Sequence, residues 1–284
     1  MRKIKQLHQA VFDPIADLDT YRAMPTRSIR HLDPFLFLNH HGPQQYGPNN
    51  NGLPFGPHPH RGFETLTFIL QGDITHRDSS TGESVIKAGG IQWMTAGSGL
   101  VHAEVSSEEF KQKGGMEEVI QLWLNLPARL KMTEPNYIGL QKDAIPSVSL
   151  DEGKVTVRLI SGEINGQKGP VHSLTGLMTS SIDFKQGGTF RTEVAPERNI
   201  LFYVVNGEVE VNQTIAKTHT LVEFFNEGNS LEIKALEDST LILAHGEPYN
   251  EPIVAHGPFV MNSEEEIYQA MRDYQSGKLG VLND

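Results

Sequence analysis

The hydrophobic residues of this chain fall into short runs, and most of the runs end at turn residues. Residues 63–70 (FETLTFIL) are rich in β-branched and aromatic side chains and stop at residues 71–73 (QGD), and residues 119–126 (VIQLWLNL) form a similar run. Such segments are typical of β-strands. Because turns are frequent and helical periodicity is scarce, the pattern predicts an all-β fold, either an antiparallel barrel or a sandwich.

An earlier apolar run, residues 34–38, is followed by Asn39, His40 and His41, and we expect the strand to end there. Neighbouring residues on a strand point to opposite faces, so these two histidines are not expected to bind one ion together. A polar strand end or the rim of a pocket explains them better. Residues 44–56 are rich in Asn, Gly and Pro and predict a loop.

The strand pattern occurs twice, on either side of a polar segment. Residues 143–153 (DAIPSVSLDEG) have the composition of a loop. Strand-like runs resume after it, at residues 155–160, 177–184, 200–205 and 241–244. We therefore expect two domains, residues 1–142 and residues 143–284.

One helix is predicted near the end of the chain. Residues 263–266 (SEEE) have the form of a capping box, with acidic side chains in the first turn. Apolar residues then follow at helical spacing, and Gly277 is a suitable stop. The apolar positions are Ile267, Ala270, Met271 and Tyr274. We expect this face to pack on a core.

The two halves of the chain resemble each other. Residues 66–72 (LTFILQG) match residues 201–207 (LFYVVNG), which lie 135 positions later. With that offset His58 falls on Glu193, His60 on Ala195 and Glu64 on Asn199. The repeat predicts two similar barrels, of which only the first keeps side chains that could bind a metal.

Composition and charge exclude several classes. The formal net charge is −11 and no run of Lys or Arg occurs, so direct binding to nucleic acid is not expected. No apolar stretch is long enough for a membrane span, and the basic N-terminus is not followed by the apolar core of a secretory signal. Cysteine is absent, which excludes disulfides and thiol catalysis and fits a reducing compartment. We expect a cytoplasmic protein.

Two pairs of metal-binding side chains stand at i, i+2 spacing: His58 with His60, and His102 with Glu104. On a β-strand this spacing puts both members of a pair on one face. Together the pairs could offer three imidazoles and one carboxylate to a borderline or hard divalent ion, whereas a closed thiolate zinc site is excluded. Four ligands on an octahedral ion leave two positions open for substrate. Five further histidines lack a partner at this spacing and are expected on the surface or as hydrogen-bonded core residues; they are His76, His172, His219, His245 and His256.

These residues resemble the motifs of a known family. Gly52, His58-Pro59-His60, Glu64 and Gly72 resemble the first cupin motif, and Gly90 with residues 99–102 (GLVH) resembles the second. More specifically, the strings HPHRGFET, QWMTAGSGLVHAE, QLWLNLP and GEPYNEPIVAHGPFVMN are similar to those of the pirin family, over nearly the whole chain.

The resemblance implies two cupin-type β-barrels in tandem, a bicupin, with a short C-terminal helix. It implies iron(II), with other divalent metals as alternatives, held in the N-terminal barrel by His58, His60, His102 and Glu104. The C-terminal barrel would be free of metal. Glu64 stands at a ligand position of many other cupins but not of pirins, and we expect it close behind the ligands.

Three functions need the same ligands and stay open. The first is a dioxygenase, for example a quercetin 2,3-dioxygenase, which would open a flavonol ring with Glu104 as the general base. The second is a regulator whose iron centre tunes binding to a protein partner, a transcription factor or a metabolic enzyme. The third is a metal protein with another small-molecule substrate. The open metal positions favour the enzyme.

Overall fold

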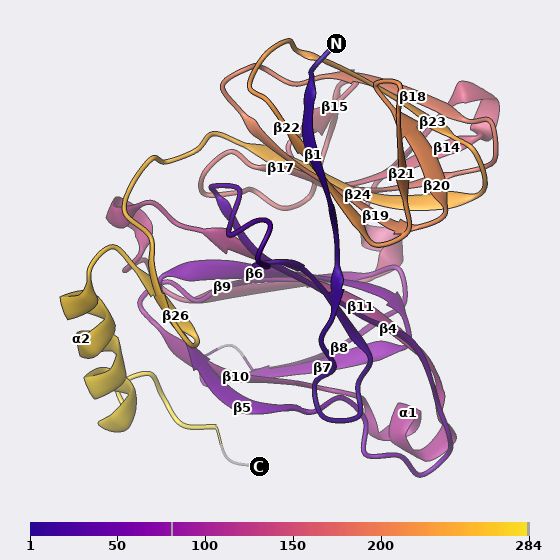
Figure 1. The fold of residues 1–284 in the computed structure, drawn as a ribbon. Helices are drawn as coiled ribbons and strands as arrows, with labels where there is room; N and C mark the ends of the chain where they lie inside the picture. Colours follow the sequence, from indigo (N-terminus) through magenta and orange to yellow (C-terminus); the bar gives the residue numbers. More distant parts are fainter. Residues whose placement is uncertain (81, 283–284) are drawn as a thin grey trace. The chain divides into compact units, whose positions relative to one another are not determined.

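The computed structural model describes residues 1–80 and 82–282, and most of the regular elements of the described chain are β-strands (Figure 1). It divides into two compact units. Unit 1 contains Met1–Val11, Arg22–Phe35 and Ala144–Pro248, and unit 2 contains Phe12–Tyr21, Leu36–Asp143 and Tyr249–Asp284. The predicted all-β fold is confirmed. No helix in the described residues is long and apolar enough to span a membrane.

Unit 1 is made of a seven-stranded sheet in the order β1-β22-β19-β24-β17-β14-β13, a four-stranded sheet in the order β18-β23-β20-β21, and the hairpin β15–β16. Its strands are β1 (Ile4–Gln9), β13 (Ser147–Leu150), β14 (Val155–Ser161), β15 (Glu163–Ile164), β16 (Gln167–Lys168), β17 (Met178–Phe184), β18 (Thr189–Glu193), β19 (Asn199–Asn206), β20 (Glu208–Val211), β21 (Thr214–Lys217), β22 (Thr220–Phe224), β23 (Ser230–Ala235) and β24 (Ser239–Gly246). Alternate residues of β14, such as Val155, Val157 and Leu159, are fully buried in its core, as the period of a strand requires.

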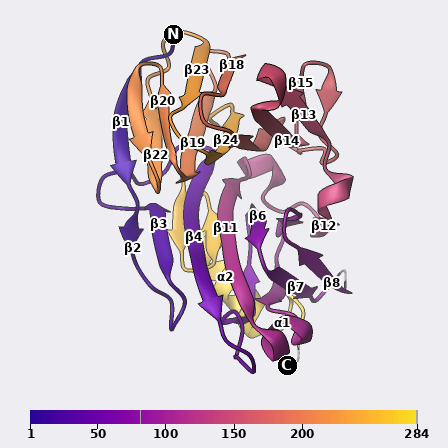
Figure 2. The ribbon, with the colours of Figure 1, turned by 90° about the vertical axis from the view of Figure 1, so that its right-hand side faces the viewer.

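Unit 2 repeats this arrangement, with a seven-stranded sheet in the order β12-β9-β6-β11-β4-β3-β2 and a four-stranded sheet in the order β5-β10-β7-β8. The strands of these two sheets, with the hairpin β25–β26, are β2 (Val11–Phe12), β3 (Thr20–Met24), β4 (Phe35–Tyr46), β5 (Phe55–His60), β6 (Phe63–Gln71), β7 (Asp73–Asp78), β8 (Gly82–Lys87), β9 (Ile91–Thr95), β10 (Leu100–Val105), β11 (Gly115–Asn125), β12 (Asn136–Leu140), β25 (Val254–His256) and β26 (Phe259–Met261). The limits of the unit fall inside β2 and β3 and at the first residue of β4, so Val11, residues 22–24 and Phe35 are counted with unit 1. The long strands β4 and β11 lie side by side (Figure 2).

Two α-helices and three short 3-10 helices complete the described chain. They are α1 (Glu108–Lys113), α2 (Glu264–Gln275), η1 (Ala128–Leu130), η2 (Lys142–Ala144) and η3 (Asp151–Gly153). The predicted capping box of α2 is present: Ser263 Oγ accepts from the Glu266 backbone N–H, and the Glu266 side chain accepts from the Ser263 backbone N–H. Ile267 and Ala270 are buried as expected, whereas Tyr274 is exposed.

The internal repeat is visible in the strand orders. Strand β6 and strand β19, which carry the matching sequences, are each third in a seven-stranded sheet. Likewise β5, which holds His58 and His60, corresponds to β18, which ends at Glu193. The tandem of two cupin-type barrels with a C-terminal helix is therefore confirmed.

Each terminal segment belongs to a different unit from the one that its position in the sequence suggests. The main change of unit falls between Asp143 and Ala144, next to the expected boundary, but residues 1–11 belong to unit 1 and residues 249–284 to unit 2. Residues 1–11 do so because β1 pairs antiparallel with β22. Local periodicity shows which residues are buried but not which segment buries them, so the expected limits of 1–142 and 143–284 did not include this exchange.

Strand β4 is longer than expected. It continues from Phe35 through His40 and His41 to Tyr46, and both histidines are buried. His40 Nε2 lies 3.0 Å from Glu118 Oε1, and His41 Nδ1 lies 2.8 Å from Thr20 Oγ1. The expected strand end at residues 39–41 is wrong, because these hydrogen bonds satisfy polar side chains inside a continuous strand.

Candidate metal centre

Three of the predicted site residues meet inside unit 2. His58 and His60 lie on β5 and His102 on β10, and these strands pair antiparallel with His102 opposite His58. One ring nitrogen from each histidine lies within 4.8 Å of the others. The ring centroids are 4.4 Å apart for His58 and His102 and 4.9 Å apart for His60 and His102. This arrangement could hold a metal ion, because the i, i+2 spacing on β5 turns both of its histidines to one face.

Backbone contacts orient two of the rings. His58 Nδ1 lies 2.7 Å from the Gly56 carbonyl oxygen, and His60 Nδ1 lies 3.2 Å from that of Pro258. A carbonyl only accepts, so each Nδ1 carries the proton and each Nε2 keeps its lone pair. His60 Nε2 and both nitrogens of His102 are buried and have no hydrogen-bond partner in the structure. Lone pairs left in this way are suited to binding a metal ion.

The surroundings keep the imidazoles of His60 and His102 neutral. Burial lowers the pKa of His60 to about 3, with a further contribution from the neighbouring His58. Burial also lowers the pKa of His102 well below its usual value, and His60, His58 and His76 act in the same direction. Metal binding requires the neutral form of histidine, so these side chains are ready to bind without releasing a proton.

Glu104 lies on the same face of β10 as His102, two residues further along, and is buried. Its Oε1 accepts a hydrogen bond of 3.1 Å from Thr67 Oγ1, and its Oε2 accepts one of 2.6 Å from Gln121 Nε2. The structure therefore groups the three histidines and holds the glutamate beside them in a polar layer. Its role as the fourth ligand stays a prediction.

His76 lies nearer to the site than the sequence suggested. It is a hydrogen-bonded core residue, as expected, with Nε2 at 2.8 Å from Asp78 Oδ2, but its ring centroid is only 5.4 Å from that of His102. It also stacks on Tyr137, with centroids 3.9 Å apart. His76 and Asp78 form an i, i+2 pair, so the rule that found the other pairs could have found this one.

Aromatic side chains form a wall beside the histidines. The ring of Trp123 lies 5.3 Å from that of His60, and Phe63 lies 5.0 Å from His60. Phe37 stacks on Trp123, with ring centroids 4.6 Å apart. Trp123 and Phe37 are only half-buried, so this wall can offer flat apolar surface to a ring-shaped ligand.

Glu64 does not stand behind the ligands. Its Oε1 accepts from Trp93 Nε1 at 3.0 Å and from Thr95 Oγ1 at 2.6 Å. Thr67, which contacts Glu104, is three residues further along β6 and therefore points to the opposite face of the sheet. Burial raises the pKa of Glu64. The expected place close behind the ligands is wrong, because strand alternation turns this side chain away from the histidines.

The C-terminal segment supports the strand that carries His60. The guanidinium of Arg61 donates from Nη1 to Asp273 Oδ2 on α2 at 2.9 Å, and from Nε to the Ser98 carbonyl at 2.7 Å. The Val260 N–H donates to the Arg61 carbonyl at 3.0 Å. Hydrogen bonds from Lys278 and Arg61 hold the pKa of Asp273 well below its usual range. Arg61 therefore pairs with a structural carboxylate.

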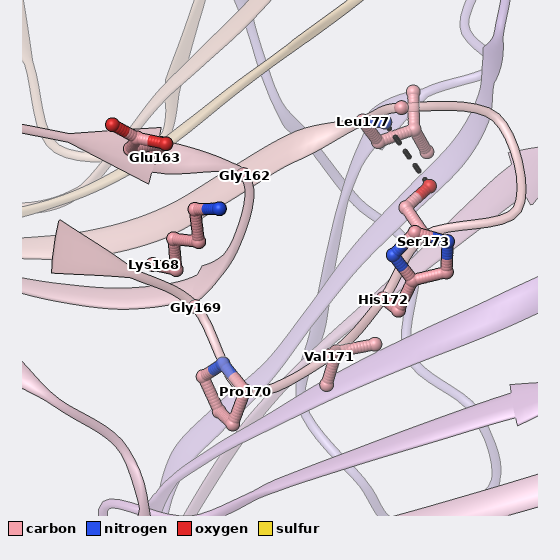
Figure 3. A pocket seen from close by; sticks show the side chains of 10 residues that line it. Gly162, Glu163, Lys168, Gly169, Pro170, Val171, His172, Ser173 and Leu177 are labelled. Atoms are coloured by element: carbon pink, nitrogen blue, oxygen red, sulfur yellow. Dashed lines mark hydrogen bonds between the residues drawn. The ribbon is translucent and has the colours of Figure 1, made fainter. Parts of the chain in front are cut away.

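Unit 1 has a hollow of about 330 Å³ beside the β15–β16 hairpin (Figure 3). Its polar side chains include Glu163, Lys168 and His172, all exposed. The Ser173 hydroxyl is occupied, because it accepts a hydrogen bond of 3.0 Å from the Leu177 N–H. This hollow has no buried polar group aimed into it and is a weaker candidate than the histidine cluster.

Comparison with known proteins gives the family. The pirin family model matches residues 17–124, and the model of the pirin C-terminal cupin domain matches residues 179–280. A pirin-like protein from Caulobacter vibrioides is 38% identical, over 90% of this chain and 91% of its own. Human pirin is also 38% identical, over 91% of this chain and 87% of its own.

A solved structure covers the whole fold. The crystal structure of a quercetin 2,3-dioxygenase from Acinetobacter baumannii is 36% identical, with a TM-score of 0.93 over 100% of both chains. The two family models together cover most of this chain, and the fold, the repeat and the histidine cluster agree with them. This chain belongs to the pirin family.

Proposed function

We propose that this protein is a metal-dependent dioxygenase that acts on flavonols, with the metal held by His58, His60, His102 and Glu104. The observation that carries the proposal is the cluster of three imidazole nitrogens within 4.8 Å, with those of His60 and His102 buried and lacking hydrogen-bond partners. The similar structure from Acinetobacter baumannii, a quercetin 2,3-dioxygenase, supports the substrate class.

Iron(II) is the metal of the proposal. Three imidazoles and one carboxylate suit a borderline divalent ion, and pirins bind iron, although other divalent metals fit the same donors. When bound, the metal would polarise the substrate oxygens as a Lewis acid and supply the redox chemistry that dioxygen requires. The orientation of His58 and His60 supports their role as ligands, because their Nδ1 atoms face backbone carbonyls and their Nε2 atoms are left for the metal.

The protein side chains would bind and orient the flavonol. The half-buried rings of Trp123 and Phe37 offer a flat surface beside His60. Glu104, once loosened from the metal, would take the proton of the flavonol hydroxyl, with Thr67 and Gln121 orienting its carboxylate. Loss of that proton makes the ring electron-rich and reactive towards dioxygen.

The second barrel would remain without metal. Within residues 1–80 and 82–282 no other group of three His, Asp or Glu ligand atoms comes together. Glu193, which corresponds to His58, is exposed. Asn199, which corresponds to Glu64, instead donates to the Asp33 carbonyl at 2.6 Å. One metal per chain, in the first barrel, is thus part of the proposal, as is a cytoplasmic location.

Two measurements test the function. Elemental analysis should find one metal per chain in the wild type and a large loss in His58→Ala, because a lost ligand leaves the others poorly organised. Iron-loaded protein should consume oxygen while the absorbance of quercetin falls, and His60→Ala should do neither. Equal metal in wild type and variant would refute the ligand set. Absence of turnover by fully loaded protein with several flavonols would reject the enzyme and favour regulation through a protein partner.

A further inference from the structure

A serine, a histidine and a glutamate form a hydrogen-bonded chain in unit 1, and none of them belongs to the metal centre. Ser28 Oγ lies 2.9 Å from His8 Nδ1, and His8 Nε2 lies 3.0 Å from Glu223 Oε2. An ionised carboxylate only accepts, so Nε2 carries the proton and Nδ1 is left to accept from the Ser28 hydroxyl. This is the order of contacts between a nucleophile, a general base and the group that orients the base.

Three separate segments bring these side chains together. His8 is on β1 and Glu223 on β22, and the antiparallel register of these strands places Gln6 opposite Glu223 and His8 opposite Leu221. Ser28 lies in the turn after β3. The strand pairing therefore fixes the base and its orienting carboxylate, and the turn presents the hydroxyl to them.

Burial and charge differ among these three residues in the way that an activated serine requires. The His8 side chain is 0% exposed, whereas Ser28 is exposed and open to a ligand. Lys5 Nζ donates to the other oxygen of Glu223 at 2.8 Å. Burial raises the pKa of Glu223, but the hydrogen bonds from Lys5 and His8 outweigh it, and the net pKa is below the usual value. Glu223 is therefore a carboxylate at neutral pH.

Two backbone N–H groups point to the side-chain oxygen of the neighbouring Thr26. The backbone N–H groups of Ser28 and Ile29 both donate to Thr26 Oγ1, each over a long 3.3 Å, and this oxygen lies 3.0 Å from Ser28 Oγ. Two amide donors thus converge on a point close to the nucleophile, as in sites that stabilise a tetrahedral intermediate. In the present structure the threonine hydroxyl occupies that point.

We propose that Ser28, His8 and Glu223 form a second reactive site, at which Ser28 accepts the acyl group of a small activated carboxylic ester. The Ser28 oxygen forms a bond to the ester carbonyl carbon while its proton passes to His8 Nδ1. The carbon–oxygen bond to the leaving alcohol then breaks, and His8 returns the proton to that alcohol. Water repeats the sequence and releases the carboxylic acid, so no oxidant or reductant is needed. A turn of the Thr26 side chain frees the two amides for the carbonyl oxygen.

The test uses the metal-loaded full chain and a fluorophosphonate probe, whose phosphorus takes the place of the carbonyl carbon and loses fluoride. Mass spectrometry of the digest should place the adduct on Ser28, and p-nitrophenyl acetate should release p-nitrophenol in a burst. Ser28→Ala should abolish both. His8→Gln and Glu223→Gln should slow labelling by about a hundredfold, the usual effect of removing a general base. Thr26→Ala should speed it.

Matched controls separate this site from ordinary surface chemistry. Ser149 is also an exposed serine of unit 1, and Ser149→Ala should leave the labelling rate unchanged. Metal content and melting temperature should match the wild type in Ser28→Ala, which shows that the variant folds. An unlabelled Ser28, labelling of Ser28 and Ser149 at equal rates, or a rate independent of His8 and Glu223 would each overturn the proposal. Slower labelling of Thr26→Ala would reject the proposed place of the oxyanion.

Discussion

Asp273 on helix α2 and Arg61, the residue after His60, form a buried ion pair with 2.9 Å between Oδ2 and Nη1. The carbonyl of Pro258, from the same C-terminal segment, also contacts His60 itself. A segment more than 190 residues away in sequence thus orients one of the three clustered histidines, and we expect its loss to weaken metal binding.

Asp273→Asn is therefore expected to weaken metal binding by about ten- to a hundredfold, the usual effect of removing a partner that orients a ligand. Titration of the metal-free protein with iron(II) or a substitute divalent ion measures the affinity. Lys278→Met is the control, because it removes a second, exposed ion-pair partner of Asp273 and leaves Arg61 and Gln269 in place. Equal affinity in wild type and Asp273→Asn would show that the ion pair only secures the helix.

Gly62 should tolerate no side chain. Its φ is +89°, and a Cβ would lie 2.0 Å from the Val260 carbonyl oxygen. Gly62→Ala is expected to lower the free energy of unfolding by about 1–3 kcal/mol or more, because it combines backbone strain with displacement of β26. Urea unfolding measures this. Gly56→Ala is the matched control on the same stretch, since a Cβ there meets nothing within 4 Å.

Alternation along strands explains what could be predicted from the sequence. The i, i+2 spacing predicts that His58 and His60 lie on one face of a strand. In the structure they lie close to His102, which is on a paired strand. The rule says nothing about which distant segment lies behind a strand. The sequence does not indicate the contact between His60 and Pro258 or the unit to which each terminal segment belongs, because both depend on tertiary packing.

The same alternation applies to Glu64 and His76. The motif position of Glu64 predicts a place near the site, but three residues separate Glu64 from Thr67, and an odd separation puts the two side chains on opposite faces. His76 and Asp78 have the spacing of the other pairs, so the sequence also indicates a polar pair there. Strand propensity predicts that β4 ends at residues 39–41, because buried histidines are unusual in a strand. The hydrogen-bond partners that allow their burial come from other segments and are not evident from the sequence.

The metal-free protein should lose stability as the pH falls below about 6.5. Burial holds the pKa of His60 at about 3, below the value of about 6.5 in the unfolded chain. Between these two values the unfolded state binds the extra proton, so a single such group lowers the free energy of unfolding by about 1.4 kcal/mol per pH unit. Stability from this histidine is complete above pH 6.5 and is lost towards pH 3.

Urea unfolding in the presence of a chelator, from pH 7 to pH 4, measures that slope. His60→Gln removes the titrating group and should flatten the curve relative to the wild type. His172→Gln is the control, because His172 is exposed in unit 1. Parallel curves for wild type and His60→Gln would contradict a neutral, buried imidazole at this position.

Glu104→Gln separates metal binding from proton transfer. The amide keeps the size of the side chain, and its single oxygen can still accept one of the two hydrogen bonds that Thr67 and Gln121 now donate to the carboxylate. It cannot take up a proton at neutral pH, so kcat for quercetin should fall by about a hundred- to ten-thousandfold while much of the iron is retained.

The measurement is oxygen uptake per bound iron, with elemental analysis of the same sample. Gln121→Leu provides the comparison, since it leaves the carboxylate as a base while removing the donor to Oε2 and the acceptor of the Trp123 Nε1–H. We expect it to reduce turnover less than Glu104→Gln does. If Glu104→Gln loses its iron as completely as His60→Ala, the carboxylate acts chiefly as a ligand. If it keeps both iron and turnover, the proton is accepted elsewhere, and His76, close to His102 and paired with Asp78, is the next residue to replace.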